Sequence, residues 1–491
     1  MKKIIITLSI FAVLFTSCER VDYGDINQNP ISPEGDDIEA MVRGAMIAYG
    51  DQGYRAGYDV TSCYAQYQAQ TSYTNEQLYS QFPGSWRTNY VSILNTLKRA
   101  HDINEYVTPI GNDTRTTNIK ATTELFSILV WKRITDTFGD IPYFEALQGG
   151  ANITPAYTAQ KDIYIDLIAR AKAARDMIDP SAPTLNADSD IYYGGDMTKW
   201  GKFANSMILA LTIQLSNTSE AGMAQTEFQA ALADAHGLIE SNADNLVFTP
   251  DNAGNSQNPI SHERASDYLL TKEFTDALKG AGSWGPLLSD TKNPTSNTHG
   301  DGRIAGYLDS NGDGLPYGFR EYPDVYADNA VEMNYNYQAA SAPFTLFSAA
   351  YTWLNRAEGS LIYATGEDTN TMFGNGIAAS YASVVGAVGS AASHTANRLA
   401  DVAGSVTMAQ VIAEEKWIAL FPDGHTAWTE QRRTGFPALH AAPEATNGGV
   451  VPQRMLYPNG EAALNPSSYT AGLQGLTPAE DKNTSKVWWA Q

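Results

Sequence analysis

Apolar side chains recur every three or four residues along most of the chain, which is the spacing of an amphipathic α-helix. A break at Thr108–Asn112 (TPIGN) separates the first two stretches of this kind, so we expect them to form an antiparallel helix pair. Repeated helix pairs predict a mostly α-helical, tetratricopeptide-like scaffold with long irregular loops and little strand, although no exact repeat of about 34 residues is visible. The spacing predicts helices over 86–100, 125–138, 160–178, 200–215, 225–241, 344–364 and 408–420.

Two long segments interrupt the helical pattern. Residues 242–259 and 280–341 are rich in Gly, Asn, Pro and Tyr. Apolar and aromatic residues are scattered through both segments, which is not typical of linkers between domains. We therefore expect loop insertions within a single α-helical domain over 37–491. Loops of this length inside a domain are usually functional or partly disordered.

The N-terminus has the parts of a secretory signal. A pair of lysines precedes the apolar run Ile4–Phe15, which is too short to cross a membrane. The run leads into LFTSC, which resembles a bacterial lipobox. We expect residues 1–17 to be a lipoprotein signal peptide, Cys18 to carry the lipid, and residues 18–36 to form a tether. An ordinary signal peptide with a chance cysteine is the alternative.

Charge and cysteine content narrow the functional classes. The chain of 491 residues carries 32 Lys and Arg against 54 Asp and Glu, a formal net charge of −22. Nucleic-acid binding needs a basic surface, so this balance argues against it. With only two cysteines, no disulfide framework is available. If Cys18 is lipidated, Cys63 is expected to be a lone buried residue.

Several strings along the chain follow the order of one known family. They are TDTFGDIPY over 135–143, GGDMTKWGKFAN over 194–205, WLNRAE over 353–358, FPDGHTAWTEQRRTGFP over 421–437 and PQRMLYPNGEAALN over 452–465. Together with the lipobox, these strings resemble the SusD/RagB family of outer-membrane nutrient-binding lipoproteins. The resemblance covers residues 20–491.

The resemblance implies a non-catalytic, lipid-anchored protein at the cell surface, on the outer membrane. Members of the family capture glycans, or sometimes peptides, and pass them to a SusC-like TonB-dependent transporter. The expected function is therefore binding of an oligosaccharide or polysaccharide nutrient, with no required cofactor. A surface glycosidase or esterase, a peptide-binding member of the family, and a purely structural or adhesion module are the alternatives.

Aromatic residues in irregular segments are the candidates for contacting a glycan. A sugar ring stacks its C–H face on an aromatic ring, and short amides bind its hydroxyl groups. Aromatic residues on a helical stripe, such as Trp86, more often fill the core, and packing remains the alternative for every candidate. The predicted ligand-binding residues are Tyr73, Asn75, Tyr79, Trp284, Tyr307, Tyr317, Tyr322 and Tyr326.

The polar residues of the family strings are expected to hold the fold. Arg432 and Arg433 offer guanidinium donors near a helix end. We expect both, together with Asp423 and Glu430, to bond to protein groups rather than to a ligand. The adjacent glutamates at 414–415 point about 100° apart on one helix, so they are expected to be solvated charges and not a catalytic pair.

One segment resembles the start of a calcium-binding loop. Asp309, Asn311 and Asp313 place oxygen ligands at positions 1, 3 and 5 of such a loop, and Gly314 takes position 6. Position 12 is Arg320 rather than a bidentate glutamate, and no flanking helices are evident. A calcium site and a plain Asx-rich turn both remain open.

Overall fold

The computed structural model describes residues 37–52, 58–107, 114–251, 254, 256–262, 267–280, 293–322 and 330–491. Ile38–Gln491 form one structural unit, and Met1–Asp37 belong to another. The predicted signal peptide, the lipidation site at Cys18 and the tether lie outside the described residues. The candidate residues Trp284 and Tyr326 lie outside them as well.

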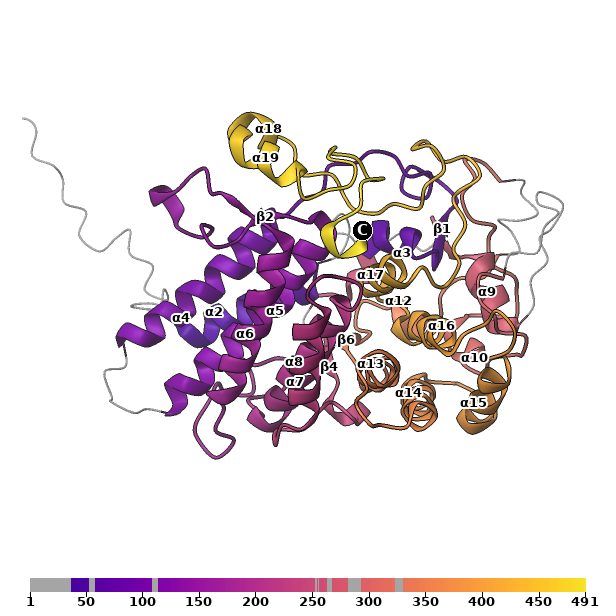
Figure 1. The fold of residues 1–491 in the computed structure, drawn as a ribbon, viewed down its shortest axis with the longest axis horizontal. Coiled ribbons are helices and arrows are strands. Elements are labelled where there is room, and N and C mark those ends of the chain that lie inside the picture. Colours follow the sequence, from indigo (N-terminus) through magenta and orange to yellow (C-terminus); the bar gives the residue numbers. More distant parts are fainter. Residues whose placement is uncertain are drawn as a thin grey trace, which may run out of the picture. The chain divides into compact units, whose positions relative to one another are not determined.

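The first half of the body is a series of antiparallel helices. From α4 to α8, each helix contacts the next one in chain order (Figure 1). This is the arrangement of stacked helix pairs that the spacing predicts. The bounds are α2 Ile38–Gly50, α3 Tyr58–Tyr64, the π-helix η2 Thr88–Leu94, α4 Asn95–Val107, α5 Thr114–Phe138, α6 Gln160–Asp176, α7 Met197–Gln214 and α8 Ala221–Leu232.

The second half continues with helices joined by longer irregular segments. Helix α13 packs on both α7 and α14, and so connects the two halves. Its neighbours α16 and α17 contact each other, and α17 returns to α3. The bounds are α9 Lys272–Lys279, α10 Ile304–Tyr307, α12 Tyr335–Gln338, α13 Ala349–Ile362, α14 Thr369–Ser383, α15 Ala391–Ala400, α16 Met408–Leu420, α17 Gly424–Thr434, α18 Glu461–Leu464, α19 Pro466–Leu473 and the 3-10 turn η6 Trp488–Ala490.

Strand is confined, within the described ranges, to three short antiparallel pairs. They are β1 Gln68–Gln70 with β5 Tyr268–Leu270, β2 Ile141–Pro142 with β3 Tyr157–Thr158, and β4 Leu246–Phe248 with β6 Phe344–Phe347. The prediction of a mostly α-helical scaffold with little strand is confirmed. No helix among the described residues is long and apolar enough to cross a membrane.

Three predicted helices have the wrong bounds. The helix predicted over 125–138 is α5, which begins at Thr114. The first residues of the predicted helix 344–364 form strand β6 instead, because FTLF pairs with LVF of β4. The helix starts only after Ser348, whose hydroxyl caps it by accepting from the backbone N–H of Tyr351 at 3.1 Å. The predicted helix 225–241 ends at Leu232. A turn follows, in which Asp234 accepts from the backbone N–H of His236 at 3.0 Å. The apolar residues after that turn are buried without being helical.

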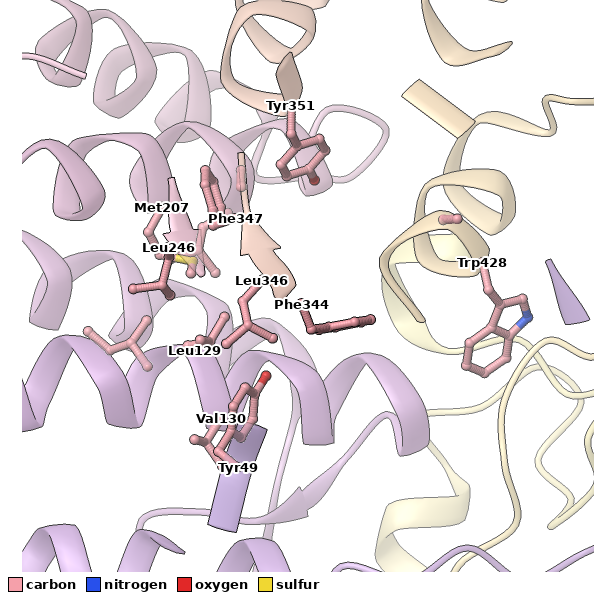
Figure 2. Packing of buried hydrophobic residues seen from close by; sticks show 14 of the residues in the cluster. Tyr49, Leu129, Val130, Met207, Leu246, Phe344, Leu346, Phe347, Tyr351 and Trp428 are labelled. Atoms are coloured by element: carbon pink, nitrogen blue, oxygen red, sulfur yellow. The ribbon is translucent and has the colours of Figure 1, made fainter. Parts of the chain in front are cut away.

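The hydrophobic core runs between the helix stack and the pair β4–β6. In Figure 2, Leu246 of β4 and Leu346 of β6 lie between the helices that carry Met207 and Leu129, and all four side chains are buried. Burial of such side chains contributes roughly 1.5–3 kcal/mol each to folding. Cys63 is buried and forms no disulfide with any described residue, as predicted.

The polar residues of the family strings build the interior, as predicted. Arg433 donates to Glu358 at 2.6 Å and to Glu430 at 2.5 Å, and Lys416 lies between the same two carboxylates. All four side chains are buried. Because each charge has an opposite partner, the cluster avoids the large cost of an unpaired buried ion.

Arg432 has a different environment from its neighbour. Its guanidinium carbon lies 3.5 Å from the ring centroid of Trp428 and 4.8 Å from that of Trp489. It donates to the backbone carbonyls of Asp136 and Gln453, each at 2.8 Å. Burial is the main cause that lowers its pKa, to about 9. The side chain therefore joins three distant segments through its stacking and hydrogen bonds.

The expectation that the glutamates at 414–415 are solvated is wrong. Both are buried. Arg398 donates to Glu414 at 2.5 Å and to Glu415 at 3.0 Å, and Arg303 donates to Glu415 at 2.6 Å. Arg398 lies in the preceding helix α15, and Arg303 lies 112 positions before Glu415, so the spacing on this helix alone could not reveal either partner.

Candidate ligand-binding face

A polar loop after β1 carries Tyr73, the most exposed of those predicted tyrosines that the structure describes. Gln70 and Gln77 close the loop, because the backbone N–H of Gln70 donates to Gln77 at 2.9 Å and the Gln77 amide donates back to the carbonyl of Gln70 at 3.0 Å. Tyr73 lies between them with 76% of its surface exposed and a φ of 56°. A left-handed backbone at a bulky residue costs about 1 kcal/mol or more, and such strain is concentrated at functional sites.

The Gly-rich middle segment binds to the base of this loop. The Gln77 amide donates to the carbonyl of Phe319 at 2.8 Å. Tyr322 donates its hydroxyl to the carbonyl of Pro316 at 2.6 Å, which folds the segment back on itself. The loop and the middle segment are therefore held together by Gln77.

A third segment joins them from the C-terminal part of the chain. The backbone N–H of Arg320 donates to the Glu444 carboxylate at 2.7 Å, and the backbone N–H of Thr446 donates to the carbonyl of Leu78 at 2.8 Å. At Gly318, a Cβ would lie only 2.6 Å from Ala442, so glycine is required for this close approach. We call the surface formed by residues 71–82, 314–322 and 440–447 the loop face.

Two of the predicted ligand-binding tyrosines lie beneath the loop face and not on it. Tyr79 and Tyr317 are buried, with ring centroids 6.2 Å apart. The Tyr79 hydroxyl accepts from the backbone N–H of Ala442 at 3.3 Å, and burial raises its pKa. Their ring faces are covered by protein, so in this structure they support the loop face and offer no surface to a sugar.

Tyr307 is also a core residue in this structure. It ends α10 and packs against Phe421, with ring centroids 4.7 Å apart. Its hydroxyl donates to the carbonyl of Ile418 at 3.2 Å. The prediction placed it among the loop aromatics because its surrounding sequence is rich in glycine. The α16 partner that covers it is more than a hundred positions away along the chain.

Three of the predicted ligand-binding residues lie on the loop face with exposed or partly exposed side chains. Tyr73 and Asn75 are exposed on its first loop, and Tyr322 is half-buried with its ring beside Phe319 at a centroid distance of 5.9 Å. The sequence reasoning missed the charged side chains of this surface, since solvated charges are common on any loop. These are Glu76, Arg320, Glu321 and Glu444.

The calcium-loop residues lie at the surface, and one of them is already paired with a cation. Asp309 and its neighbours in the turn are at least partly exposed. The Lys279 ammonium donates to the carbonyl of Gly312 at 2.8 Å and to the Asp313 carboxylate, and this hydrogen bond lowers the pKa of Asp313. Calcium binding stays a prediction, and calcium would have to compete with Lys279 for these oxygens.

A second group of possible metal ligands is buried around Arg303. Ligand atoms of Asp301, His394 and Glu415 lie within 4.8 Å of one another. However, Nη2 of Arg303 lies 2.6 Å from a carboxylate oxygen of both Asp301 and Glu415. Because the guanidinium already neutralises the carboxylates, we interpret the group as a structural ion cluster.

Comparison with known proteins identifies the family. The sequence model of the SusD-like family, described as starch-binding and associating with the outer membrane, matches residues 33–458. No curated protein matches the chain.

Solved structures share the fold over nearly the whole chain. A SusD homologue from Bacteroides uniformis is 22% identical with a TM-score of 0.75, covering 93% of this chain and 100% of that one. A SusD homologue from Parabacteroides distasonis is 23% identical with a TM-score of 0.76, covering 92% and 97%. A chitin-binding SusD homologue from Flavobacterium johnsoniae is 20% identical with a TM-score of 0.74, covering 93% and 99%. The helical architecture and the family match over most of the sequence agree, and the chain belongs to the SusD-like family of binding proteins.

Proposed function

We propose that the protein binds a glycan nutrient at the loop face and releases it chemically unchanged. The observation that carries this proposal is the ring of Tyr73, which stands 76% exposed on a strained loop over a closely packed base. An exposed aromatic ring that is already held in place can stack on a sugar with little loss of conformational entropy. The family description of starch binding and the chitin-binding relative support a saccharide ligand.

The polar groups of the loop face suit a neutral sugar. Asn75 offers both an amide donor and a carbonyl acceptor, and Arg320 and Glu444 add a charged donor and a charged acceptor. Hydroxyl groups of a sugar both donate and accept, so a mixed set of this kind can satisfy them. The aromatic ring then covers the C–H face of the same sugar.

The proposal includes a lipid anchor in the outer membrane and a transporter that receives the glycan. The family is described as associating with the outer membrane. We propose that Cys18 carries the lipid that anchors the protein there, on the outer surface of the cell. We propose also that a SusC-like TonB-dependent transporter receives the glycan. Co-purification from the native membrane in detergent tests the partnership, and recovery of the protein alone contradicts it.

Substitution of Tyr73 tests the glycan site. Tyr73→Ala is expected to weaken binding of maltoheptaose or chitohexaose about tenfold, since an aromatic stack is worth roughly 0.5–1.5 kcal/mol. Tyr73→Phe keeps the ring and is expected to retain most of the affinity. Isothermal titration calorimetry on the full chain measures both variants.

Tyr335 provides the matched control, because it is a tyrosine of similar exposure, 73%, on α12 and outside the loop face. Tyr335→Ala is expected to bind as the native chain does. Equal binding by Tyr73→Ala and the native chain contradicts the assignment of the site. New reducing ends after incubation with either saccharide contradict release of the ligand unchanged and favour a glycosidase.

A further inference from the structure

A pocket of about 270 Å³ opens on the helix stack, and none of its lining residues belongs to the loop face. Its walls come from α4, α5, α6 and the segment that follows β2. The volume is below the roughly 300–1,000 Å³ of pockets for drug-sized ligands, and it suits a single six-membered ring.

The pocket has an apolar floor and an aromatic lip. Leu97 and Trp131 form part of the floor and are buried. Tyr143 packs edge-to-face on Trp131, with centroids 4.8 Å apart, and Phe144 packs edge-to-face on Tyr143 at 5.0 Å. The Phe144 side chain is the outer member of this series and is 60% exposed. Beside it, Leu147 has a left-handed φ of 61°, so the lip is held in a strained conformation.

One wall of the pocket carries a fixed polar network. The Tyr143 hydroxyl donates to Asp166 at 2.6 Å and accepts from Nη1 of Arg170 at 2.5 Å. Nε of Arg170 donates to one carboxylate oxygen of Glu124. Among the described residues, the second oxygen of Glu124 and Nη2 of Arg170 have no hydrogen-bond partner. A donor and an acceptor are therefore left on the same wall, which is what two adjacent hydroxyl groups need.

The charges around the pocket disfavour an anionic ligand. Arg170 is opposed by Glu124 and Asp166, and Lys98 is paired with Asp102. The balance of these five groups is one negative charge, so a sulfate or a uronic acid would be repelled. A neutral ring with hydroxyl groups and an apolar face fits both the network and the aromatic lip.

We propose that this pocket is a second saccharide-binding site, which holds one neutral hexose or N-acetylhexosamine ring at the end of a glycan. The ring stacks on Phe144, and its hydroxyl groups bond to Arg170 and Glu124. The proposal rests on the proposed function in its choice of a saccharide. The site is separate from the loop face, so the two can be tested independently.

Photoaffinity labelling of the full chain tests the pocket directly. The probes are diazirine derivatives of maltose and of N,N′-diacetylchitobiose, and mass spectrometry locates the label. We expect label on peptides that contain residues 94–101, 123–131 or 143–147, and competition by the unmodified disaccharide. Phe144→Ala is expected to reduce this label about tenfold. Because Phe144 is largely exposed, its removal is expected to leave the melting temperature unchanged.

Two further variants complete the test. Ile153 is 82% exposed in the same β2–β3 connection but does not line the pocket, so Ile153→Ala is expected to label as the native chain does. Tyr73→Ala is expected to lose label on the loop face and to keep it in the pocket.

The other labelling patterns distinguish between the two proposed sites. Label restricted to the loop face, label in the pocket that Phe144→Ala does not reduce, or no label at all overturns the second site. Label restricted to the pocket, with none on the loop face, supports the second site and contradicts the proposed glycan site at the loop face. Failure of one proposal is therefore distinguishable from failure of the other.

Discussion

Tyr73 and Tyr79 lie in the same polar segment and share a left-handed backbone, with φ values of 56° and 59°. Tyr73 is open to solvent, whereas Tyr79 is covered by Tyr317 and by the backbone around Ala442. Local sequence cannot separate the two residues, since Tyr317 and Ala442, which cover Tyr79 together with Tyr64, lie more than two hundred positions away. Sequence alone therefore could not tell which of the two rings is exposed, and ligand contact by this loop stays a prediction.

Replacement of a core tyrosine distinguishes packing from ligand contact. Tyr307→Ala is expected to lower the free energy of unfolding by about 3–5 kcal/mol, because it leaves a cavity against Phe421. Tyr73→Ala is expected to change it by no more than about 0.5 kcal/mol. Urea unfolding followed by circular dichroism measures both. A small change for Tyr307→Ala contradicts its assignment to the core.

Removal of one charge from the buried ion cluster is expected to lower the free energy of unfolding strongly. Arg433→Met leaves Glu358 and Glu430 with Lys416 as their remaining cation in the cluster. The expected loss is about 3–5 kcal/mol of unfolding free energy. The exposed pair of Lys98 and Asp102 is the control, and Lys98→Met is expected to cost at most about 1 kcal/mol. Denaturant unfolding measures both variants. Similar losses of unfolding free energy would contradict the conclusion that the buried cluster needs the charge of Arg433.

At the scale of the elements, the sequence predicts helices well where the helical apolar spacing is uninterrupted. The predicted helix 408–420 coincides with α16, and the predicted 160–178 differs from α6 only at its end. The errors occur where tertiary pairing decides. FTLF over 344–347 fits a helical stripe but gains a partner strand in β4. Irregular segments such as 314–322 take their conformation from contacts with the other two segments of the loop face, and no local pattern encodes these contacts.

Two helical glycines are expected to respond in opposite ways to the same substitution. At Gly44 in α2, no other part of the protein lies within 4 Å of the position that a Cβ would take, so Gly44→Ala is expected to stabilise the protein by about 0.5–1 kcal/mol. At Gly359 in α13, a Cβ would lie 2.3 Å from the buried ring of Phe228. Gly359→Ala is therefore expected to destabilise by about 1–3 kcal/mol. Thermal unfolding measures both changes, and a shift of the same sign would show that propensity outweighs packing here.

At the scale of the whole molecule, distant parts of the chain satisfy each other's buried groups. The indole N–H of Trp417 donates to the carbonyl of Ala65 at 2.9 Å, across 352 positions. The Asn483 amide donates to the carbonyl of Tyr79 at 3.0 Å, across 404 positions. These bonds join the beginning and the end of the described body, so the loop face depends on both.

Acidic residues with opposite pKa shifts together contribute most to stability near pH 5. Burial lowers the pKa of His425, so the contribution of this residue falls as the pH drops below about 6.5. Burial raises the pKa of Asp140 and of Asp276 to about 6. The folded protein therefore binds these protons before the unfolded chain does, and their contribution to stability rises as the pH falls from about 7 to 5. For Glu358 and Glu415, burial would raise the pKa, but the nearby cationic side chains more than offset it and the pKa is lowered. That contribution is lost as the pH falls below about 4.

Urea unfolding at a series of pH values from 3 to 8 checks this profile. Asp140→Asn keeps an acceptor for the backbone N–H of Gln160 but removes the titration. Its stability is expected to rise less than that of the native chain between pH 7 and pH 5. An equal rise in the variant and in the native chain would show that Asp140 does not contribute to the pH dependence.

The sandwich of Arg432 between Trp428 and Trp489 has a consequence for biosynthesis. Trp489 lies in η6, which packs on α17, and Figure 1 shows the C-terminus beside that helix. Until the ribosome has added this indole, the guanidinium lacks one of its two covers, and the surrounding pocket stays open to water. A chain that stops before Trp489 is therefore expected to be susceptible to proteases, and a nonsense mutation just before this residue should be nearly as damaging as an early one.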